Sequence, residues 1–148
     1  MPSTHVSLYY HVVFSTKDRA PCIAGSWQAE LHAYIGGIIR SLGGVGEAVG
    51  GIDDHLHVLA SLKATHRLCD VVREMKAGSS QWIHKTVGLA PFRWQDGYGA
   101  FSVSASKVET VREYVLRQEL HHQRYGFKEE YLRLLQISGV SFDEKYLW

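Results

Sequence analysis

Near the middle of the sequence lies the stretch Gly51-Ile52-Asp53-Asp54-His55-Leu56-His57-Val58-Leu59-Ala60-Ser61-Leu62. Side chains alternate between the two faces of a β-strand, so His55 and His57 point to one face and the residues between and after them to the other. Such a pair is often no more than two half-exposed polar residues on the solvent side of a sheet. Both flanks of this pair, however, are as apolar as a buried strand, and buried imidazoles need partners. A divalent metal ion held between the rings is one such partner.

Size and composition describe an ordinary globular protein. The 148 residues are enough for one domain with a core, and we treat 1–148 as a single domain. Hydrophobic residues make up 45% of the chain and charged residues 21%. The net charge of +1 gives no overall basic field of the kind that marks many nucleic-acid-binding proteins, so a DNA surface would have to be local.

Cysteine usage and the N-terminal sequence bear on the compartment. Cys22 and Cys69 lie far apart and outside any Cys-x-x-Cys motif, so we expect reduced thiols, with no disulfide framework and no thiolate zinc site. The first residues lack the basic and apolar regions of a signal peptide, and no stretch approaches the ~20 apolar residues of a transmembrane helix. We therefore expect a cytoplasmic protein with no membrane partner.

Hydrophobic periodicity predicts alternating strands and helices. The predicted strands are at 5–14, at 45–52 and 55–62, which an Asp53-Asp54 turn joins, and at 100–104. The predicted helices are at 27–42, capped by Ser26, and from Thr65 or His66 to about 85. A further helix at about 106–125, opened by a Ser106/Glu109 capping box, and a helical tail at about 127–148 follow. The order β-α-β-β-α-β predicts an α+β, ferredoxin-like two-layer sandwich with an antiparallel sheet and appended C-terminal helices.

Basic and aromatic residues suggest where nucleic acid would bind. The outer face of the second predicted helix and the loop after the first strand carry cations and a small hydroxyl residue that suit a DNA backbone, although most such faces are simply solvated. The candidate DNA-binding residues are Lys17, Arg19, Arg73, Lys76, Ser80 and Lys85. Trp94, Tyr98 and Phe101 either stack on bases or pack in the core, and core packing is the default for such residues.

The predicted helix at 106–125 carries polar groups along its apolar stripe. Gln118 and His122 project along this stripe, and Tyr114 lies at its edge, four residues before Gln118. If His55 and His57 hold a metal ion, then either Gln118 or His122 completes the ligand set.

Tyr114 then lies within reach of whatever the metal polarises. Tyrosine, with a pKa of about 10, is a poor nucleophile unless its target is activated, and a divalent ion on a phosphodiester provides that activation. The combination indicates tyrosine attack on a nucleic-acid phosphate. Taken alone, Tyr114 would be interpreted as a packing residue with a solvated hydroxyl.

Several motifs together resemble one family. They are Tyr10-His11-Val12-Val13-Phe14-Ser15-Thr16-Lys17, the His55-Leu56-His57 strand, Trp94-Gln95-Asp96-Gly97-Tyr98-Gly99 and Tyr114-Val115-Leu116-Arg117-Gln118. The chain resembles the IS200-like, single-tyrosine HUH transposases of small insertion sequences, which are related to the REP-associated tyrosine transposases. HUH denotes two histidines around a hydrophobic residue.

The resemblance implies a specific activity. Such enzymes cleave and rejoin single-stranded DNA at hairpin-bearing element ends, leaving a 5′-phosphotyrosine and a free 3′-hydroxyl. It implies Tyr114 as the nucleophile, with His55, His57 and Gln118 as ligands of Mg²⁺ or Mn²⁺. Adjacent His121 and His122 offer competing donors, so His122 stays the alternative third ligand. The resemblance also implies a homodimer in which the tyrosine helix of one subunit can complete the site of the other.

Three other functions remain consistent with these residues. A non-catalytic single-stranded nucleic-acid module would use the sheet as a platform and need neither metal nor Tyr114. A hydrolytic metalloenzyme would use metal-bound water and form no protein adduct. A domesticated or regulatory relative of the transposases would share the same catalytic residues.

Overall fold

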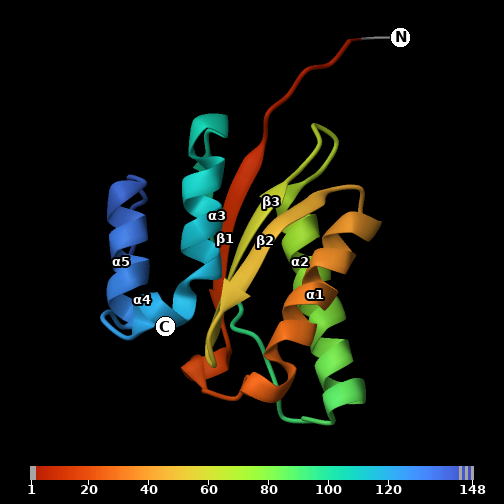
Figure 1. The fold of residues 1–148 in the computed structure, drawn as a ribbon, viewed down its shortest axis with the longest axis vertical. Coiled ribbons are helices and arrows are strands. Elements are labelled where there is room, and N and C mark those ends of the chain that lie inside the picture. The colour runs from red at the N-terminus through yellow and green to blue at the C-terminus, as the bar shows by residue number, and fades with distance from the viewer. Residues whose placement is uncertain (1–2, 144, 146, 148) are drawn as a thin grey trace.

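A four-stranded antiparallel sheet organises the chain, which the computed structural model describes for residues 3–143, 145 and 147. The strands are β1 (Tyr9–Ser15), β2 (Val45–Gly51), β3 (His55–Ser61) and β4 (Gly99–Val103), in the spatial order β2-β3-β1-β4. With a helix after β1 and another after β3, this is the ferredoxin-like arrangement, so the predicted fold is confirmed (Figure 1).

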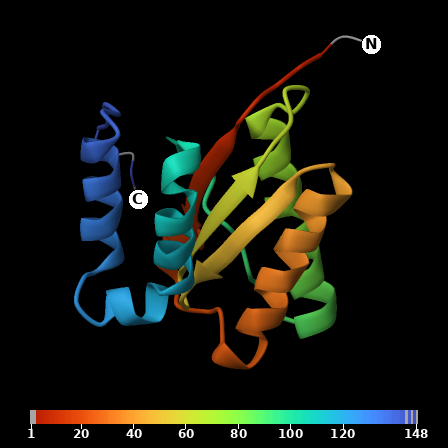
Figure 2. The ribbon, with the colours of Figure 1, turned by 45° about the horizontal axis from the view of Figure 1, so that its top comes forward.

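Helices cover both faces of this sheet. On one face lie α1 (Gly25–Ser41) and α2 (Leu68–Trp82), and on the other lie α3 (Val108–Leu116) and α5 (Phe127–Ile137), linked by the short α4 (Gln118–His122) (Figures 1 and 2). Short helical turns at Lys17–Arg19, Ile83–Val87 and Ala105–Lys107 complete the helical structure of the described residues. The appended C-terminal helices therefore form a layer of their own.

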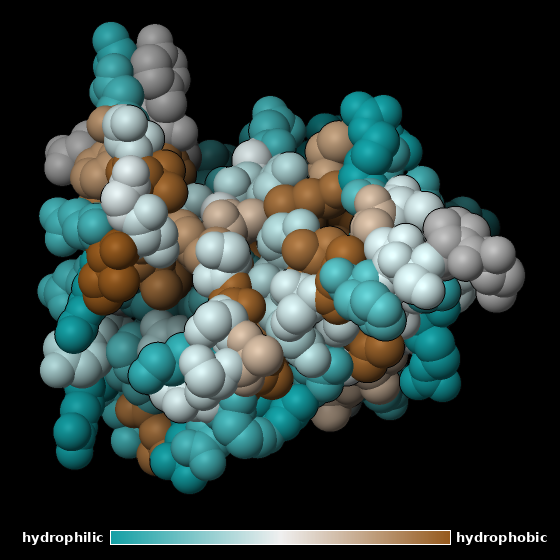
Figure 3. Space-filling view, turned by 90° about the horizontal axis from the view of Figure 1, so that it is seen from above, coloured by the Kyte–Doolittle hydropathy of each residue, from teal (hydrophilic) through white to brown (hydrophobic). Residues whose placement is uncertain are grey.

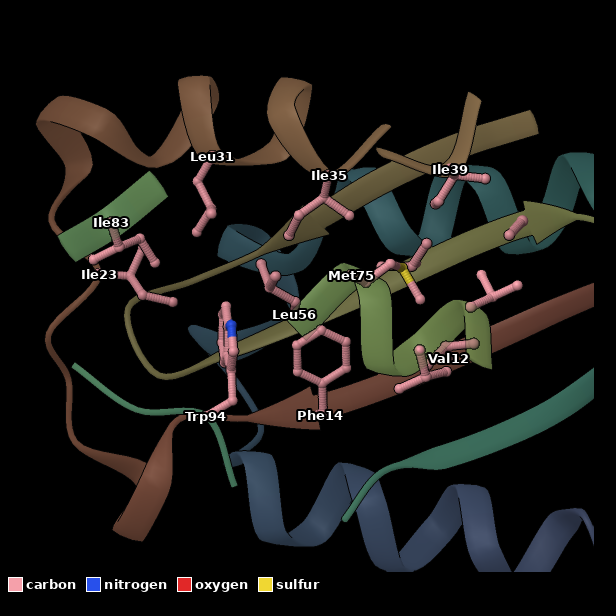
Figure 4. Close-up of a cluster of buried hydrophobic side chains, with 14 of the residues drawn as sticks. Val12, Phe14, Ile23, Leu31, Ile35, Ile39, Leu56, Met75, Ile83 and Trp94 are labelled. Atoms are coloured by element: carbon pink, nitrogen blue, oxygen red, sulfur yellow. The ribbon is translucent and has the colours of Figure 1, made fainter. Parts of the chain in front are cut away.

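The main hydrophobic core lies between the sheet and the helices α1 and α2. Alternate residues of β1 and β3 supply one side of this core, and Met75 of α2 packs into it (Figure 4). Trp94 contacts Phe14 edge to face at a centroid distance of 4.8 Å, and its indole N–H donates to Ser79 Oγ. Trp94 and Phe101 are both buried, so core packing is confirmed for these two residues, while Tyr98 is partly exposed.

The hairpin between β2 and β3 has the predicted turn at Asp53-Asp54. The Ile52 N–H donates to the His55 carbonyl, and the Asp54 carbonyl accepts from the backbone N–H of Thr16. The second bond connects the turn to the end of β1. In the β2–β3 register Gly50 pairs with His57, so a glycine lies beside the histidine.

Three predicted starts of elements are wrong. Helix α1 begins at Gly25 with Ala24 as its N-cap, so Ser26 lies inside the helix and does not cap it. The first strand begins at Tyr9 rather than at residue 5, because Val6 before it is half exposed and has no neighbouring strand. The second helix begins at Leu68 rather than at Thr65 or His66. The His66 ring bonds the Lys63 N–H through Nδ1 and the Leu42 carbonyl through Nε2, which holds this segment in a turn.

The predicted helix at 106–125 is also wrong as a single element. It breaks at Arg117, whose φ of −104° and ψ of 28° are not helical, and this break separates α3 from α4. The Ser106/Glu109 capping box does not form, because a 3₁₀ turn at Ala105–Lys107 precedes α3 and the Ser106 hydroxyl contacts that of Ser104. The break turns the chain away from the direction of α3, and α4 runs from the end of α3 towards α5 (Figure 2).

The tail predicted at 127–148 is helical only in its first part. Helix α5 ends at Ile137 and is followed by Gly139 with a φ of 68°, a left-handed value suited to glycine at a helix end. Residues 144, 146 and 148 lie outside the described residues. No helix in the described part of the chain has the length and apolar character needed to cross a membrane. On the face seen in Figure 3, hydrophobic residues reach the surface in separate patches.

Candidate active site and metal centre

The histidine pair on β3 is fully buried. His55 and His57 are each 0% exposed and face α3, α4 and α5, whereas Leu56 and Val58 belong to the core under α1 and α2. The predicted alternation is confirmed, and the interpretation of the pair as half-exposed surface residues is wrong. Both rings therefore need partners inside the protein.

The partners of His55 leave one of its nitrogens free to face the site. Nδ1–H donates to Asp54 Oδ1 at 2.7 Å, which leaves Nε2 with a lone pair when the ring is neutral. The ring stacks on Phe127 of α5 at a centroid distance of 4.2 Å. Burial lowers the pKa of His55, but the hydrogen bonds to Asp54 and Glu130 outweigh it, and the net pKa is raised.

His57 is held by a third histidine. Its Nδ1 lies 2.7 Å from Nε2 of His11 on β1, and its Nε2 lies 2.8 Å from Oε1 of Glu130. Burial lowers the pKa of His57 to about 4 and that of His11 to about 3, so both rings are neutral at neutral pH. Sequence reasoning missed His11. The sequence did contain a signal for it: side chains alternate along the first strand, so His11 lies on the face opposite to that of apolar Val12.

Both candidates for the third ligand reach the histidine pair. The Gln118 amide donates to the Tyr114 carbonyl, so its Oε1 faces inward, 3.4 Å from His55 Nε2 and 3.0 Å from His122 Nε2. His122 Nδ1–H donates to the Tyr125 carbonyl at 2.8 Å, which leaves its Nε2 facing the same point. The structure thus brings Gln118 and His122 together and leaves both as candidate ligands.

Glu130 of α5 contacts the histidine pair, His122 and Tyr114, and was not identified from the sequence. Its carboxylate is buried, with Oε1 facing three imidazoles and Oε2 accepting the Tyr114 hydroxyl. Burial raises the pKa of Glu130, but hydrogen bonds from His122, His55 and His57 outweigh it and hold the pKa far below its usual range. The sequence signal was a charged residue on the apolar stripe of α5, three residues after Phe127 and four before Leu134.

The converging atoms form a donor set that fits a divalent metal ion. One ligand atom from each of His55, His57, His122 and Glu130 lies within 4.8 Å of the others. Nε2 of His55 and of His122 faces carboxylate and amide oxygens, so these contacts need either a proton on each imidazole or a cation between the acceptors. Imidazole nitrogens and carboxylate oxygens are ordinary metal ligands. The residues could therefore hold a metal ion.

Tyr114 lies beside this donor set. Its ring centroid is 5.6 Å from that of His57, and its hydroxyl donates to Glu130. Burial and the negative charge of Glu130 raise the pKa of Tyr114 well above its ordinary value. The phenol is therefore protonated, and a neutral phenol is a poor nucleophile towards any electrophile that is not activated. A pocket of about 500 Å³ opens beside Tyr114 and is also lined by Arg133 and His121.

Comparison with known proteins places the chain in a family. The family described as "Transposase IS200 like" matches residues 4–118. The chain belongs to this family. The matched part of the transposase includes the histidine pair, Tyr114 and Gln118, whereas His122 and Glu130 lie beyond it. A search among curated proteins found no match.

Two solved structures share the fold of the transposase. One is a candidate transposase from Deinococcus radiodurans R1, with a TM-score of 0.64 and 19% identity over 78% of this chain and 93% of the other. The second is a REP-associated tyrosine transposase bound to a REP hairpin, with a TM-score of 0.61 and 14% identity over 82% of this chain and 73% of the other. At these identities the likeness concerns the fold.

The predicted DNA-binding residues of the transposase are only partly brought together, and none of them lines the pocket beside Tyr114. Lys17, Lys76 and Ser80 line one pocket of about 340 Å³, to which the structure adds Arg93. Lys76 donates to the carbonyls of Gln95 and Gly97, so it also holds the loop before β4.

The other three predicted cations do not line that pocket. Arg19 follows Lys17 in the 3₁₀ turn, with a positive φ of 53°. Arg73 is exposed and pairs with Asp70 at 3.1 Å, and Lys85 is exposed in the turn that follows α2. The structure thus groups two of the five predicted cations, together with Ser80.

Proposed function

We propose that this transposase cleaves and rejoins single-stranded DNA through a 5′-phosphotyrosine on Tyr114, assisted by Mg²⁺ or Mn²⁺. The proposed ligands are His55 and His57 with Gln118, or with His122 in its place. One observation carries the proposal: the Tyr114 hydroxyl and the buried histidines meet at the same carboxylate. A nucleophile of this type beside a metal-capable donor set matches phosphoryl transfer, and the family is one of transposases.

The residues have distinct roles in this reaction. The Tyr114 oxygen forms a bond to phosphorus while the bond from phosphorus to the 3′ oxygen breaks, and the phenolic proton is lost as the 3′ oxygen becomes a hydroxyl. Rejoining is the reverse reaction, in which a 3′-hydroxyl attacks the phosphotyrosine. A bound divalent ion supplies Lewis-acid polarisation of the phosphate. Asp54 orients the His55 ring through His55 Nδ1, and His11 orients the His57 ring through His57 Nδ1.

The proposed substrate is a DNA hairpin with single-stranded flanks. A structural neighbour was solved with a REP hairpin, which supports a hairpin ligand here. The pocket with Lys17, Lys76 and Arg93 offers cations for a DNA backbone, and the pocket beside Tyr114 offers room for the nucleotides at the cleaved bond. We place this activity in the cytoplasm.

The decisive experiment looks for the covalent intermediate. The protein is incubated with Mn²⁺ and labelled single-stranded DNA that contains a hairpin from its own genomic flanks, and the products are separated under denaturing conditions. We expect a protein–DNA adduct that disappears with chelator and in Tyr114→Phe. Tyr125→Phe is the matched control, because Tyr125 lines the same pocket without the bond to Glu130.

Other outcomes would contradict the proposal in different ways. Cut DNA without an adduct would favour a metalloenzyme that uses water as its nucleophile. Bound but intact hairpin DNA, with no effect of chelator, would favour a binding module or a regulatory relative.

Mixed variants test the proposed homodimer with shared sites. Tyr114 contacts Glu130 of its own chain, so one chain contains all the residues of a complete site. His57→Ala and Tyr114→Phe are each inactive alone under the proposal. Cleavage restored on mixing would show that subunits exchange their tyrosines. Lack of rescue in mixtures confirmed as dimers would show that each site is built within one chain.

A further inference from the structure

We propose that Glu130 serves two partners at once, as an anionic ligand of the metal ion and as the residue that positions the Tyr114 hydroxyl. This inference rests on the proposed function, because it needs both an ion at the histidines and a tyrosine nucleophile. It assigns a role to α5, which lies beyond the part of the chain that matches the family.

The two carboxylate oxygens of Glu130 face different partners. Oε1 lies 2.8 Å from His57 Nε2, 3.5 Å from His55 Nε2 and 3.4 Å from His122 Nε2. Oε2 accepts the hydroxyl of Tyr114 and lies 3.0 Å from His121 Nε2. One oxygen thus belongs to the histidine centre and the other to the nucleophile, so the side chain fixes the distance between them.

Packing of α5 holds this carboxylate in place. On either side of Glu130 along the helix, Phe127 stacks on the His55 ring and Leu135 packs in a buried cluster with Val13. Tyr131 approaches the backbone of β4 so closely that a Cβ on Gly99 would lie 2.7 Å from its hydroxyl. A buried residue with so many fixed neighbours is placed accurately enough to act as a ligand.

The charges of the centre also favour an ion. Glu130 is 4% exposed, and its Oε1 lies within 3.5 Å of the Nε2 atoms of three imidazoles. A buried carboxylate is costly unless it is paired, and a divalent ion between Glu130 and the imidazoles would pair it. Because imidazole nitrogens suit transition metals while Mg²⁺ prefers oxygen ligands, we expect this donor set to bind Mn²⁺ more tightly than Mg²⁺.

Mn²⁺ titration calorimetry of the full chain without DNA tests the ligand role. We expect Glu130→Gln to weaken Mn²⁺ binding at least ~10-fold, since even residues that only support a ligand contribute roughly 10–100-fold. Glu129→Gln is the matched control, because it removes the same charge from an exposed position one residue earlier on α5. Tyr114→Phe should bind Mn²⁺ like the wild type, because the Tyr114 hydroxyl contacts Oε2 and His121 and not the Oε1 that faces the histidine centre.

Adduct formation at saturating Mn²⁺ tests the positioning role. With the metal site filled, Glu130→Gln should still form the adduct about 10-fold more slowly, because the hydroxyl loses its charged acceptor. A merely structural Glu130 would lower the unfolding temperature and leave both Mn²⁺ affinity and the saturated rate unchanged. That result would overturn the inference.

The controls separate this inference from the proposed function. If the wild type binds no Mn²⁺, the metal-assisted reaction itself fails. If the wild type binds Mn²⁺, His57→Ala does not, and Glu130→Gln binds like Glu129→Gln, then only the role of Glu130 fails. Should Glu130→Gln not fold by circular dichroism, Glu130→Asp keeps the charge on a shorter side chain. Its expected Mn²⁺ affinity is several-fold below that of the wild type, and an unchanged affinity would contradict the ligand role.

Discussion

The two faces of the sheet differ in chemistry although the same strands build both. Towards α1 and α2, strands β1 and β3 present Val12, Phe14 and Leu56, which are buried among apolar side chains. Towards α3–α5, the same strands present His11 and His57, whose rings bond each other. Neighbouring residues of one strand thus contribute to different properties, one to stability and the other to the candidate site.

The two faces also differ in how burial is compensated. On the apolar face, burial is favourable by itself, at about 1.5–3 kcal/mol for a large side chain. On the other face, burial of imidazole and carboxylate groups is costly unless each finds a partner. The bonds of His55 to Asp54 and of His57 to His11 and Glu130 supply those partners. The apolar face therefore stabilises the fold on which the polar face depends.

The largest contrast is expected between His57→Ala and Leu56→Ala, one residue apart on β3. His57→Ala removes a proposed metal ligand, and we expect adduct formation to fall roughly 1,000-fold or more, because metal assistance supplies several kcal/mol of transition-state stabilisation. Leu56→Ala leaves a cavity and should lower the free energy of unfolding by about 2–5 kcal/mol. Denaturing gels measure the first effect and urea unfolding the second.

The comparison depends on these effects being separate. The folded fraction of Leu56→Ala should form adduct within about twofold of the wild-type rate, since Leu56 faces away from the site. Loss of adduct in folded Leu56→Ala would show that the two faces are coupled through the strand.

A smaller effect is expected where α3 touches the sheet. A Cβ on Gly50 would lie 1.9 Å from the Val115 carbonyl oxygen, so Gly50→Ala must push α3 away from β2. We expect a loss of about 1–3 kcal/mol in unfolding free energy from overpacking. Mn²⁺ binding should also weaken, because Gln118 follows directly after the displaced helix.

Gly37→Ala on α1 is the matched control for this substitution. A Cβ there has no neighbour within 4 Å, and alanine favours helix, so stability should rise by up to about 1 kcal/mol with Mn²⁺ binding unchanged. If Gly50→Ala bound Mn²⁺ like Gly37→Ala, the placement of α3 would not matter to the metal centre.

The smallest effect concerns pH and His32 of α1, on the apolar side of the sheet. Burial lowers the pKa of His32 from 6.5 to about 4, and within the described part of the chain its Nε2 has no hydrogen-bond partner. The unfolded chain binds a proton below pH 6.5 and the folded chain only near pH 4. The contribution of His32 to stability is therefore complete above pH 6.5 and is lost as the pH falls towards 4.

Urea unfolding of wild type and His32→Gln at pH 7.5 and 5.5 measures this contribution. The variant should lose less stability between the two pH values, with or without Mn²⁺, because His32 is remote from the metal centre. An identical pH dependence in both proteins would assign the loss to His11 and His57, whose pKa values are also lowered.

Local pattern alone determined the order of strands and helices and the faces of β3. Periods of two and of three to four residues depend on backbone geometry, so they are visible in a single sequence. Helical periodicity likewise predicted that Tyr114 and Gln118 lie one above the other. In the structure the Gln118 amide donates to the Tyr114 carbonyl, although α3 ends between these two residues.

Tertiary structure alone decided which distant residues complete the site. His11 and Glu130 lie 46 and 73 residues from His57 in sequence, and nothing local indicates that β1 and α5 meet there. The break at Arg117 was equally hidden, because it depends on how α4 connects α3 to α5 (Figure 2). A periodic pattern shows which face of an element is buried, whereas the partner of that face depends on how the whole chain packs.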